Sequence, residues 1–182
     1  MTDKTKDYRV TETLSEGGST LVCRANRPAD GESVLLKILK PDGATKDERA
    51  RFRREFDIAS RLDLPGVAKG LALEDSDKGL AIVFKDIGGQ SLDRMLKQGP
   101  LSLAYSLEVA IALADTLGSL HKRHIIHKDV KPSHAIVNLT TRRSTLLASG
   151  LPMRYPSAVS ARCLLRPWKE PLSTFLQSRR VV

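Results

Sequence analysis

HIIHKDVKPSHAIVNL, residues 124–139, is the stretch that says most about the fold. An apolar-striped segment precedes it and a β-branched run ends it, which predicts a helix, a polar loop and a strand in that order. Asp129 stands in the loop, where a carboxylate can accept a proton from a hydroxyl nucleophile or orient it. Lys131 can neutralise phosphate charge, and His127 is expected to support the loop backbone. An ordinary polar loop is the alternative interpretation.

Upstream of this loop, the first third of the chain is predicted to be rich in strands. A change to three- and four-residue apolar spacing over residues 46–62 then predicts an amphipathic helix, which Pro65-Gly66 ends. The expected strands are residues 8–14, 21–25, 34–39, 67–73, 80–84, 135–139 and 142–147, and the other expected helices are 92–96 and 103–121. The longest helix carries one apolar stripe of Leu103, Leu107, Ile111, Ala114, Leu117 and Leu120.

A lysine and a glutamate stand out in this pattern. Lys37 lies in the middle of the apolar strand 34–39, and Glu55 follows it 18 residues later in the amphipathic helix. Taken singly, the lysine is a side chain that snorkels from a sheet edge, and the glutamate is a solvated helix charge. Together they fit a strand lysine that a helix glutamate holds toward the α- and β-phosphates of a nucleotide.

The order of these segments resembles a eukaryotic-type protein kinase domain of the Ser/Thr class. The resemblance rests on VLLKIL (34–39), RREFDI (53–58), LAIVFKD (80–86) and HKDVKPS (127–133), and it covers residues 8–150. Several stretches are also similar to the N-terminal kinase domain of large bacterial proteins that join a kinase, an ATPase module and a sensor histidine kinase. The resemblance implies an α+β bilobal fold that binds ATP and Mg²⁺ in a cleft.

The resemblance also implies a division of the chain. We expect an N-lobe of an antiparallel sheet and one helix in residues 1–86, and part of a helical C-lobe in residues 87–150. Residues 84–87 would form the hinge and read the adenine through backbone groups; they are Phe84, Lys85, Asp86 and Ile87. Lys37, held by Glu55, would bind the nucleotide phosphates, and Asp129 and Lys131 would carry the transfer to a protein hydroxyl.

The glycine-rich loop departs from the kinase pattern G-x-G-x-x-G-x-V. The aligned residues are Ser15, Gly17, Thr20 and Val22, so only the middle glycine is kept, although Gly18 beside it adds backbone freedom. The large bacterial signalling proteins share this degeneracy. Ser15, Gly17, Gly18 and Val22 therefore remain the expected residues above the nucleotide.

The two expected Mg²⁺ ligands are also replaced. His134 stands where the kinase pattern has asparagine, and Ala148-Ser149-Gly150 stands where it has Asp-Phe-Gly. Mg²⁺ prefers oxygen ligands, so an imidazole is a poor substitute and alanine offers nothing. We therefore predict that nucleotide binds weakly and that phosphoryl transfer is slow or absent.

Residues 151–182 form a basic, proline-containing segment in which no kinase motif is recognisable. We expect a chain that is truncated within the C-lobe and a poorly ordered tail, with a shifted reading frame as one explanation. The tail's apolar residues could instead cover the exposed helix stripe. Two functions stay open: a Ser/Thr protein kinase domain that is catalytically impaired, or a non-catalytic pseudokinase fragment that binds nucleotide or a protein partner.

Composition excludes some partners. The net charge is +9, of which the tail carries +5, and aromatic residues make up 4% of the chain, so nucleic-acid binding is not expected. No uninterrupted apolar run reaches the 18 residues that a membrane helix needs, and the N-terminus has no signal-peptide pattern. A cytoplasmic location is expected. Cys23 and Cys163 are interpreted as reduced thiols, with a single disulfide as the alternative.

Overall fold

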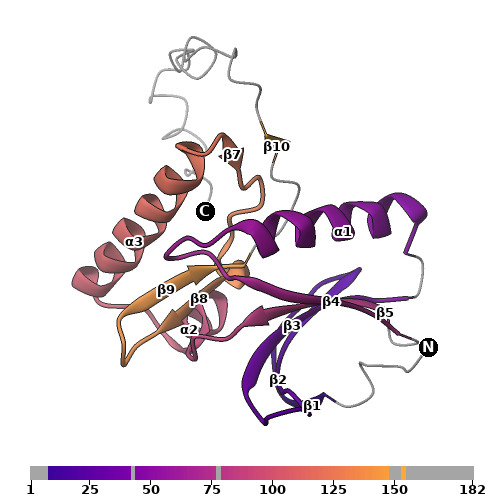
Figure 1. The fold of residues 1–182 in the computed structure, drawn as a ribbon. Helices are drawn as coiled ribbons and strands as arrows, with labels where there is room; N and C mark the ends of the chain where they lie inside the picture. The colour runs from indigo at the N-terminus through magenta and orange to yellow at the C-terminus, as the bar shows by residue number, and fades with distance from the viewer. Residues whose placement is uncertain (1–7, 42–43, 77–78, 148–152, 155–182) are drawn as a thin grey trace, which may run out of the picture.

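A five-stranded antiparallel sheet forms the N-terminal part of the protein (Figure 1). The computed structural model describes residues 8–41, 44–76, 79–147 and 153–154. The strands are β1 (Arg9–Glu16), β2 (Thr20–Asn26), β3 (Ser33–Leu39), β4 (Gly70–Ser76) and β5 (Gly79–Lys85), in the spatial order β1-β2-β3-β5-β4. The turn between β2 and β3 contains Gly31, whose φ of 73° lies in the region that glycine enters without steric cost.

The middle of this sheet is buried on both faces. On one face Leu14, Val22, Leu35 and Phe84 belong to the main hydrophobic cluster, which also includes Phe52 and Ala59 of α1. On the other face the curved sheet encloses a smaller cluster of Cys23, Ala25, Val34, Leu36 and Val83. This double burial explains why the central strands are almost continuously apolar rather than alternating.

Helix α1 (Lys46–Arg61) packs on the face of the sheet that carries the main cluster (Figure 1). Thr45 and Glu48 form a capping box at its start: the hydroxyl of Thr45 accepts from the Glu48 backbone, and the Glu48 carboxylate accepts from the Thr45 backbone. The buried residues of α1 are Phe52, Glu55 and Ala59, so the face that meets the sheet includes one carboxylate.

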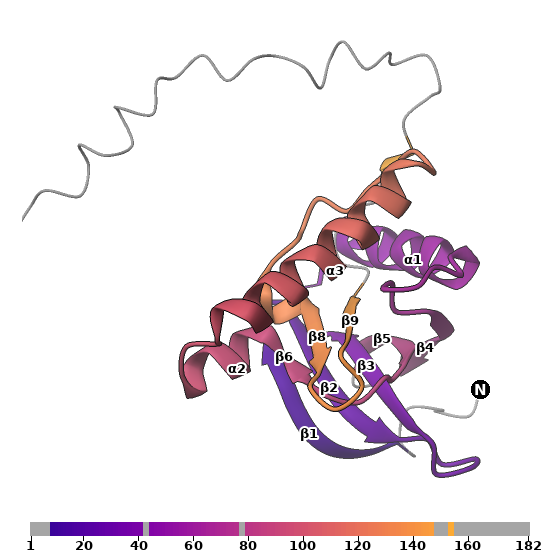
Figure 2. The same cartoon turned by 90° about the vertical axis from the view of Figure 1, so that its left-hand side faces the viewer.

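The described residues of the C-terminal part form two α-helices, one short 3-10 helix and short strands. They are β6 (Gln90–Ser91), α2 (Leu92–Gln98), α3 (Leu103–His121), β7 (Ile125–Ile126), η1 (Pro132–His134), β8 (Ala135–Asn138), β9 (Arg143–Leu146) and β10 (Met153–Arg154). Strands β6, β8 and β9 form a three-stranded sheet, and β7 pairs with β10. Figures 1 and 2 show β8 and β9 between α3 and the five-stranded sheet, so the loop that joins β7 to β8 faces that sheet.

The structure confirms the predicted fold class, an α+β arrangement with an antiparallel sheet and one helix at the N-terminal side. One expected strand was wrong in its start: β4 begins at Gly70, not at Val67. The backbone around Val67 instead bonds β9, because Ala68 N donates to the Leu146 carbonyl at 2.9 Å and Leu146 N donates to the Gly66 carbonyl at 2.8 Å. The predicted lobe boundaries remain a prediction, and the tail, apart from residues 153–154, lies outside the described residues.

The predicted apolar stripe of α3 is only partly buried. Leu103, Leu107 and Ile111 are 76%, 54% and 62% exposed. The side chains that pack inward are Val109, Thr116 and Leu120, because the inner face of α3 follows β7, β8 and the segment after α1. By length and composition, α3 could cross a bilayer, and a single such helix is weak evidence for a membrane protein. The expected cytoplasmic location therefore stays a prediction.

Candidate active site

A buried ion pair joins the sheet to α1. Lys37 Nζ lies 2.6 Å from Glu55 Oε1 and 2.8 Å from Oε2, and the two residues are 4% and 5% exposed. Lys37 occupies β3 between Val22 of β2 and Ile82 of β5, so its backbone is fixed on both sides. The Phe52 ring, whose centroid is 5.5 Å from Nζ, adds a cation–π contact. The ammonium is therefore held in one place before any ligand arrives.

Burial dominates the ionisation of Glu55. Loss of solvent raises the pKa of its carboxyl to about 7, against the attraction of the Lys37 ammonium, and the nearby Asp129 carboxylate raises it further. This carboxylate consequently depends on the lysine for its charge at neutral pH. Removing the lysine would leave a carboxyl group that burial drives toward its neutral form.

The loop before η1 is held by His127. Its Nε2 lies 2.9 Å from the Leu147 carbonyl oxygen, and burial lowers the pKa of the imidazole, so a neutral ring donates this bond. Lys128 has a φ of 63°, a left-handed conformation that is unusual for a residue with a side chain. The His127 bond and the bend at Lys128 fix the backbone just before Asp129, whose side chain lies between the five-stranded sheet and the C-terminal part.

The Asp129 carboxylate contacts the side-chain nitrogens of two residues. Its Oδ2 lies 3.2 Å from Lys131 Nζ and 3.3 Å from His134 Nδ1, and its backbone oxygen lies 3.1 Å from the same Nδ1. Burial lowers the pKa of His134 to about 4, although Asp129 favours the charged form. A neutral imidazole that carries its proton on Nδ1 satisfies both contacts, because both oxygens are acceptors.

These groups line one cavity of about 410 Å³ between the two parts of the protein. The residues around it are Ser19, Thr20, Lys37, Leu39, Glu48, Arg51, Phe52, Glu55, Lys128, Asp129, Lys131 and His134. Its charged groups are therefore four cations and three carboxylates. A multiply charged anion such as a polyphosphate would meet four cations here, of which Lys37 and Lys131 are paired with the carboxylates of Glu55 and Asp129.

The structure places the remaining candidate residues elsewhere. Ser15 is the second-last residue of β1 and is opposite Val22. Gly17 lies in the turn that follows, where its N–H donates to the Thr20 carbonyl at 2.8 Å. Phe84 and Lys85 end β5, and residues 86 and 87 follow it. None of the candidates Ser15, Gly17, Gly18, Val22, Phe84, Lys85, Asp86 and Ile87 lines the 410 Å³ cavity.

The sequence reasoning did not select five polar residues of the cavity as site residues: Ser19, Thr20, Glu48, Arg51 and Lys128. Arg51 precedes Glu55 by four residues, so the two share a face of α1, and this spacing was a usable signal. Lys128 adjoins Asp129 in the motif itself. Ser19 and Thr20 belong to the glycine-containing turn and follow the glycines that drew attention.

The donor set does not fit Mg²⁺. Among the described residues, no group of three or more His, Cys, Asp and Glu side chains is placed to hold a metal ion. At the position of the family's asparagine, His134 offers a nitrogen, and Mg²⁺ binds oxygen in preference to nitrogen. Ala148, the other replaced position, lies outside the described residues.

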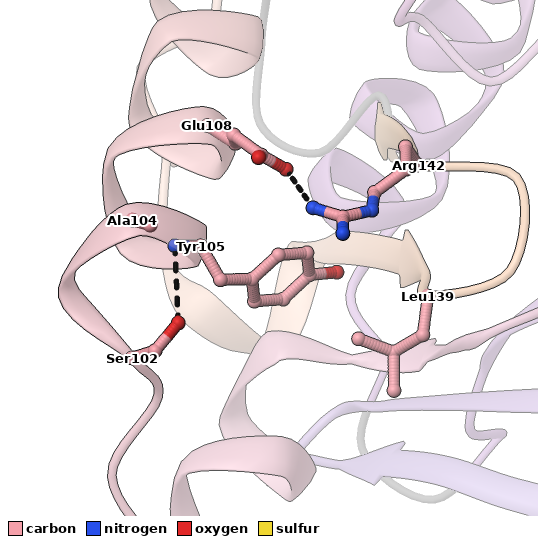
Figure 3. Close-up of a pocket in the computed structure, with 6 residues that line it drawn as sticks. All are labelled: Ser102, Ala104, Tyr105, Glu108, Leu139 and Arg142. Atoms are coloured by element: carbon pink, nitrogen blue, oxygen red, sulfur yellow. Dashed lines mark hydrogen bonds and ion pairs between the residues drawn. The ribbon is translucent and has the colours of Figure 1, made fainter.

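A second cavity of about 340 Å³ opens at the N-terminal end of α3 (Figure 3). Arg142 forms an ion pair with Glu108 there and lies over the Tyr105 ring, 5.6 Å from its centroid. Figure 3 shows Arg142 reaching across toward Glu108, with the Tyr105 ring below. The guanidinium is thus already neutralised by a carboxylate, which leaves this cavity without the surplus of cations that lines the first.

His134 gives a pH-dependent contribution to stability that a variant can isolate. Between pH 7 and pH 5 the unfolded histidine, with a pKa of 6.5, takes up a proton, whereas the folded one, with a pKa of about 4, does not. The unfolded state therefore binds more protons, and acid destabilises the fold. We expect the His134→Asn variant to gain about 2 kcal/mol relative to the unsubstituted protein over this range. Urea unfolding at a series of pH values measures it, and a difference that stays constant with pH would contradict it.

Known proteins that are similar to this chain are protein kinases. A family model described as protein kinase domain matches residues 8–147. Among curated relatives, serine/threonine-protein kinase pkn2 of Myxococcus xanthus is 29% identical over 136 residues, 74% of this chain and 16% of the relative. Serine/threonine-protein kinase pkn3 of the same organism is 33% identical over 134 residues, 71% of this chain and 24% of the relative. Myosin light chain kinase A of Dictyostelium discoideum is 24% identical over 138 residues, 75% of this chain and 47% of the relative. The matched region thus spans less than half the length of each of these relatives.

Proposed function

The chain belongs to the protein kinase domain family, and from that premise we propose that it binds ATP with the phosphates in the 410 Å³ cavity and transfers the γ-phosphate only slowly. One observation carries the proposal. The buried pair of Lys37 and Glu55 lines the same cavity as Asp129 and Lys131, although these residues come from β3, α1 and the loop before η1. Phosphoryl transfer depends mainly on such positioning and on charge stabilisation.

Each charged residue has a role in this proposal. Lys37, held by Glu55, binds the α- and β-phosphates, and Lys131 neutralises the γ-phosphate. Asp129 orients the hydroxyl of a protein substrate and accepts its proton as the oxygen–phosphorus bond forms. The adenine is read by backbone groups of residues 84–87, and Ser15, Gly17, Gly18 and Val22 lie above the nucleotide.

The metal positions support slow transfer. In the family, Mg²⁺ would supply positive charge against the charge that develops on the phosphates. His134 bonds Asp129 through Nδ1, and Ala148 has no ligand atom. Losing one well-placed electrostatic group costs about 10²–10³ in rate. A phosphoryl-transfer rate of about 1 s⁻¹, which is ordinary for kinases, would contradict this proposal.

A second candidate function is a non-catalytic module that binds nucleotide or a protein partner. The contact between His134 and Asp129 favours it, because a neutral imidazole lies beside the carboxylate that a substrate hydroxyl would have to reach. The proposal names the substrate only as a hydroxyl group of a protein. It places the chain in the cytoplasm.

ATP binding can be tested without measuring activity. We expect ATP to raise the unfolding temperature equally in EDTA and in Mg²⁺, since the cations of the cavity hold the phosphates. Lys131→Met, at a side chain that is 47% exposed, should weaken ATP binding about tenfold without destabilising the fold. Lys97→Met is the matched control, because Lys97 is exposed and pairs with Asp93 on α2. Calorimetry measures the affinities, and no stabilisation by ATP in either buffer would overturn the proposal.

A further inference from the structure

Arg24 on β2 is the centre of a polar network at the hinge end of the cleft. Its Nε lies 2.7 Å from Asp86 Oδ2, its NH2 group donates to the Gly89 carbonyl at 2.6 Å, and its NH1 group forms an ion pair with Glu12. The side chain of Asp86 is 3% exposed. Three partners therefore hold one guanidinium, and they come from β1 and from the segment just after β5.

The strand register places Arg24 on the face of the sheet that meets the cleft. In β2 and β3, Arg24 is opposite Leu35 and Val22 is opposite Lys37. Since alternate residues of a strand share a face, Arg24 lies on the same side as Lys37, whose ammonium lines the cavity. Arg24 and Lys37 are thus diagonal neighbours on this face, beside Val22 and Leu35. Arg24 is the nearer of the two to residues 84–87, because Leu35 is also opposite Phe84.

The network continues from the sheet to α2. Glu12 of β1 forms ion pairs with Arg24 through one carboxylate oxygen and with Arg94 of α2 through the other. Asp86 also accepts from Ser33 Oγ at 2.8 Å and from Gly88 N at 2.9 Å. Charged groups therefore bridge the two parts of the protein where the chain itself passes between them.

The apolar residues behind this network are packed closed. Leu14 and Leu35 from the sheet and Ile136 from β8 belong to one buried cluster and are 5%, 1% and 0% exposed. A nucleotide with its phosphates at Lys37 and its base at residues 84–87 must place the base alongside Val22 and Leu35. The base can enter only if the sheet and β8 move apart there.

We propose that Arg24, with Glu12, Asp86, Gly89 and Arg94, is a latch that closes the hinge end of the cleft and limits the entry of a nucleotide base. The inference rests on the proposed nucleotide site. The latch acts on the base and not on the phosphates, because none of its five residues lines the cavity around Lys37 and Lys131. Opening the latch should therefore speed the association of ATP and leave a bare polyphosphate unaffected.

The test compares a fluorescent ATP analogue with inorganic tripolyphosphate. We expect Arg24→Met to raise the association rate of the analogue about tenfold, and Arg94→Gln, at the 44% exposed end of the latch, to raise it about threefold. Tripolyphosphate affinity should change less than about twofold in both variants, since no phosphate contact is removed. Arg27→Gln is the control, because Arg27 pairs with Asp30 and Glu32 inside one turn and does not bridge the two parts.

Each outcome decides something. The latch is overturned if the analogue associates with both variants at the rate of the unsubstituted protein. It is also overturned if tripolyphosphate binding improves as much as analogue binding does. In both cases the proposed ATP site stands. If Arg24→Met does not fold, Arg94→Gln decides alone. If the unsubstituted protein and the variants bind neither ATP nor its analogue, the proposed nucleotide site fails and the latch fails with it.

Discussion

Replacing Lys37 with methionine should lower the free energy of unfolding by about 3–5 kcal/mol, because the buried Glu55 carboxyl loses its counter-charge and must then either stay charged or take up a proton, both at a cost. The attraction between the two charges offsets the loss of hydration only while both are present. Urea unfolding followed by circular dichroism at pH 8 measures the change. Lys40→Met is the matched control: Lys40 is the next lysine along the chain, pairs with the exposed Glu16, and should cost no more than about 1 kcal/mol.

A double variant distinguishes the buried charge from lost packing. If the cost comes from an unpaired carboxylate, Lys37→Met combined with Glu55→Leu should return to within about 1–2 kcal/mol of the unsubstituted protein, because no charge is then buried. Packing loss alone would instead make the two substitutions add. A double variant that is less stable than either single variant would therefore contradict this account of the ion pair.

The pairing of Lys37 with Glu55 was predictable from sequence because both elements have strong local signals. A charged residue inside an apolar strand and an apolar spacing that changes period are visible in a single chain. The family resemblance then supplied the pairing itself. The apolar spacing alone did not place Glu55 on the buried face of α1, and only the family resemblance paired it with Lys37.

The network around Arg24 shows what the sequence could not supply. Its members come from β1, β2, the segment after β5, and α2, so no local spacing links Glu12 with Arg94. Asp86 was expected to serve the hinge through its backbone, and its side chain bonds Arg24, Ser33 and Gly88 as well. Such contacts depend on strand register and on the packing of two parts of the chain, which are tertiary properties.

The apolar spacing of the sequence also predicted the wrong inner face for the first half of α3. The apolar stripe from Leu103 to Leu120 describes a continuous helix face, yet its first half is exposed and the inward face includes Thr116. Gly66 explains the position of Thr116: a Cβ at Gly66 would lie 2.0 Å from the Thr116 hydroxyl. The turn at Gly66 thus approaches α3 closely at Thr116, a tertiary contact that the apolar spacing of the helix does not reveal.

The largest gain in activity is expected from restoring the two metal positions. His134→Asn combined with Ala148→Asp should raise the rate of phosphoryl transfer from ATP in Mg²⁺ by at least about 10²-fold, since both substitutions supply oxygen ligands. Each single variant should give a smaller gain, because one ligand fixes the ion less well than two. Transfer to a generic protein substrate, followed with radiolabelled ATP, measures the rate.

Asp129, the proposed catalytic base, must also be intact for this gain to appear. Asp129→Asn in the restored background should return the rate to the level of the unsubstituted protein, because an amide cannot accept the proton of the hydroxyl. His134→Asn has a second effect in the same direction, since it removes the imidazole that lies 3.3 Å from the Asp129 carboxylate. Calorimetry shows separately whether ATP binding has become dependent on Mg²⁺. A restored protein that binds ATP with Mg²⁺ and still transfers no faster would show that these positions do not limit the reaction, and would favour the non-catalytic function.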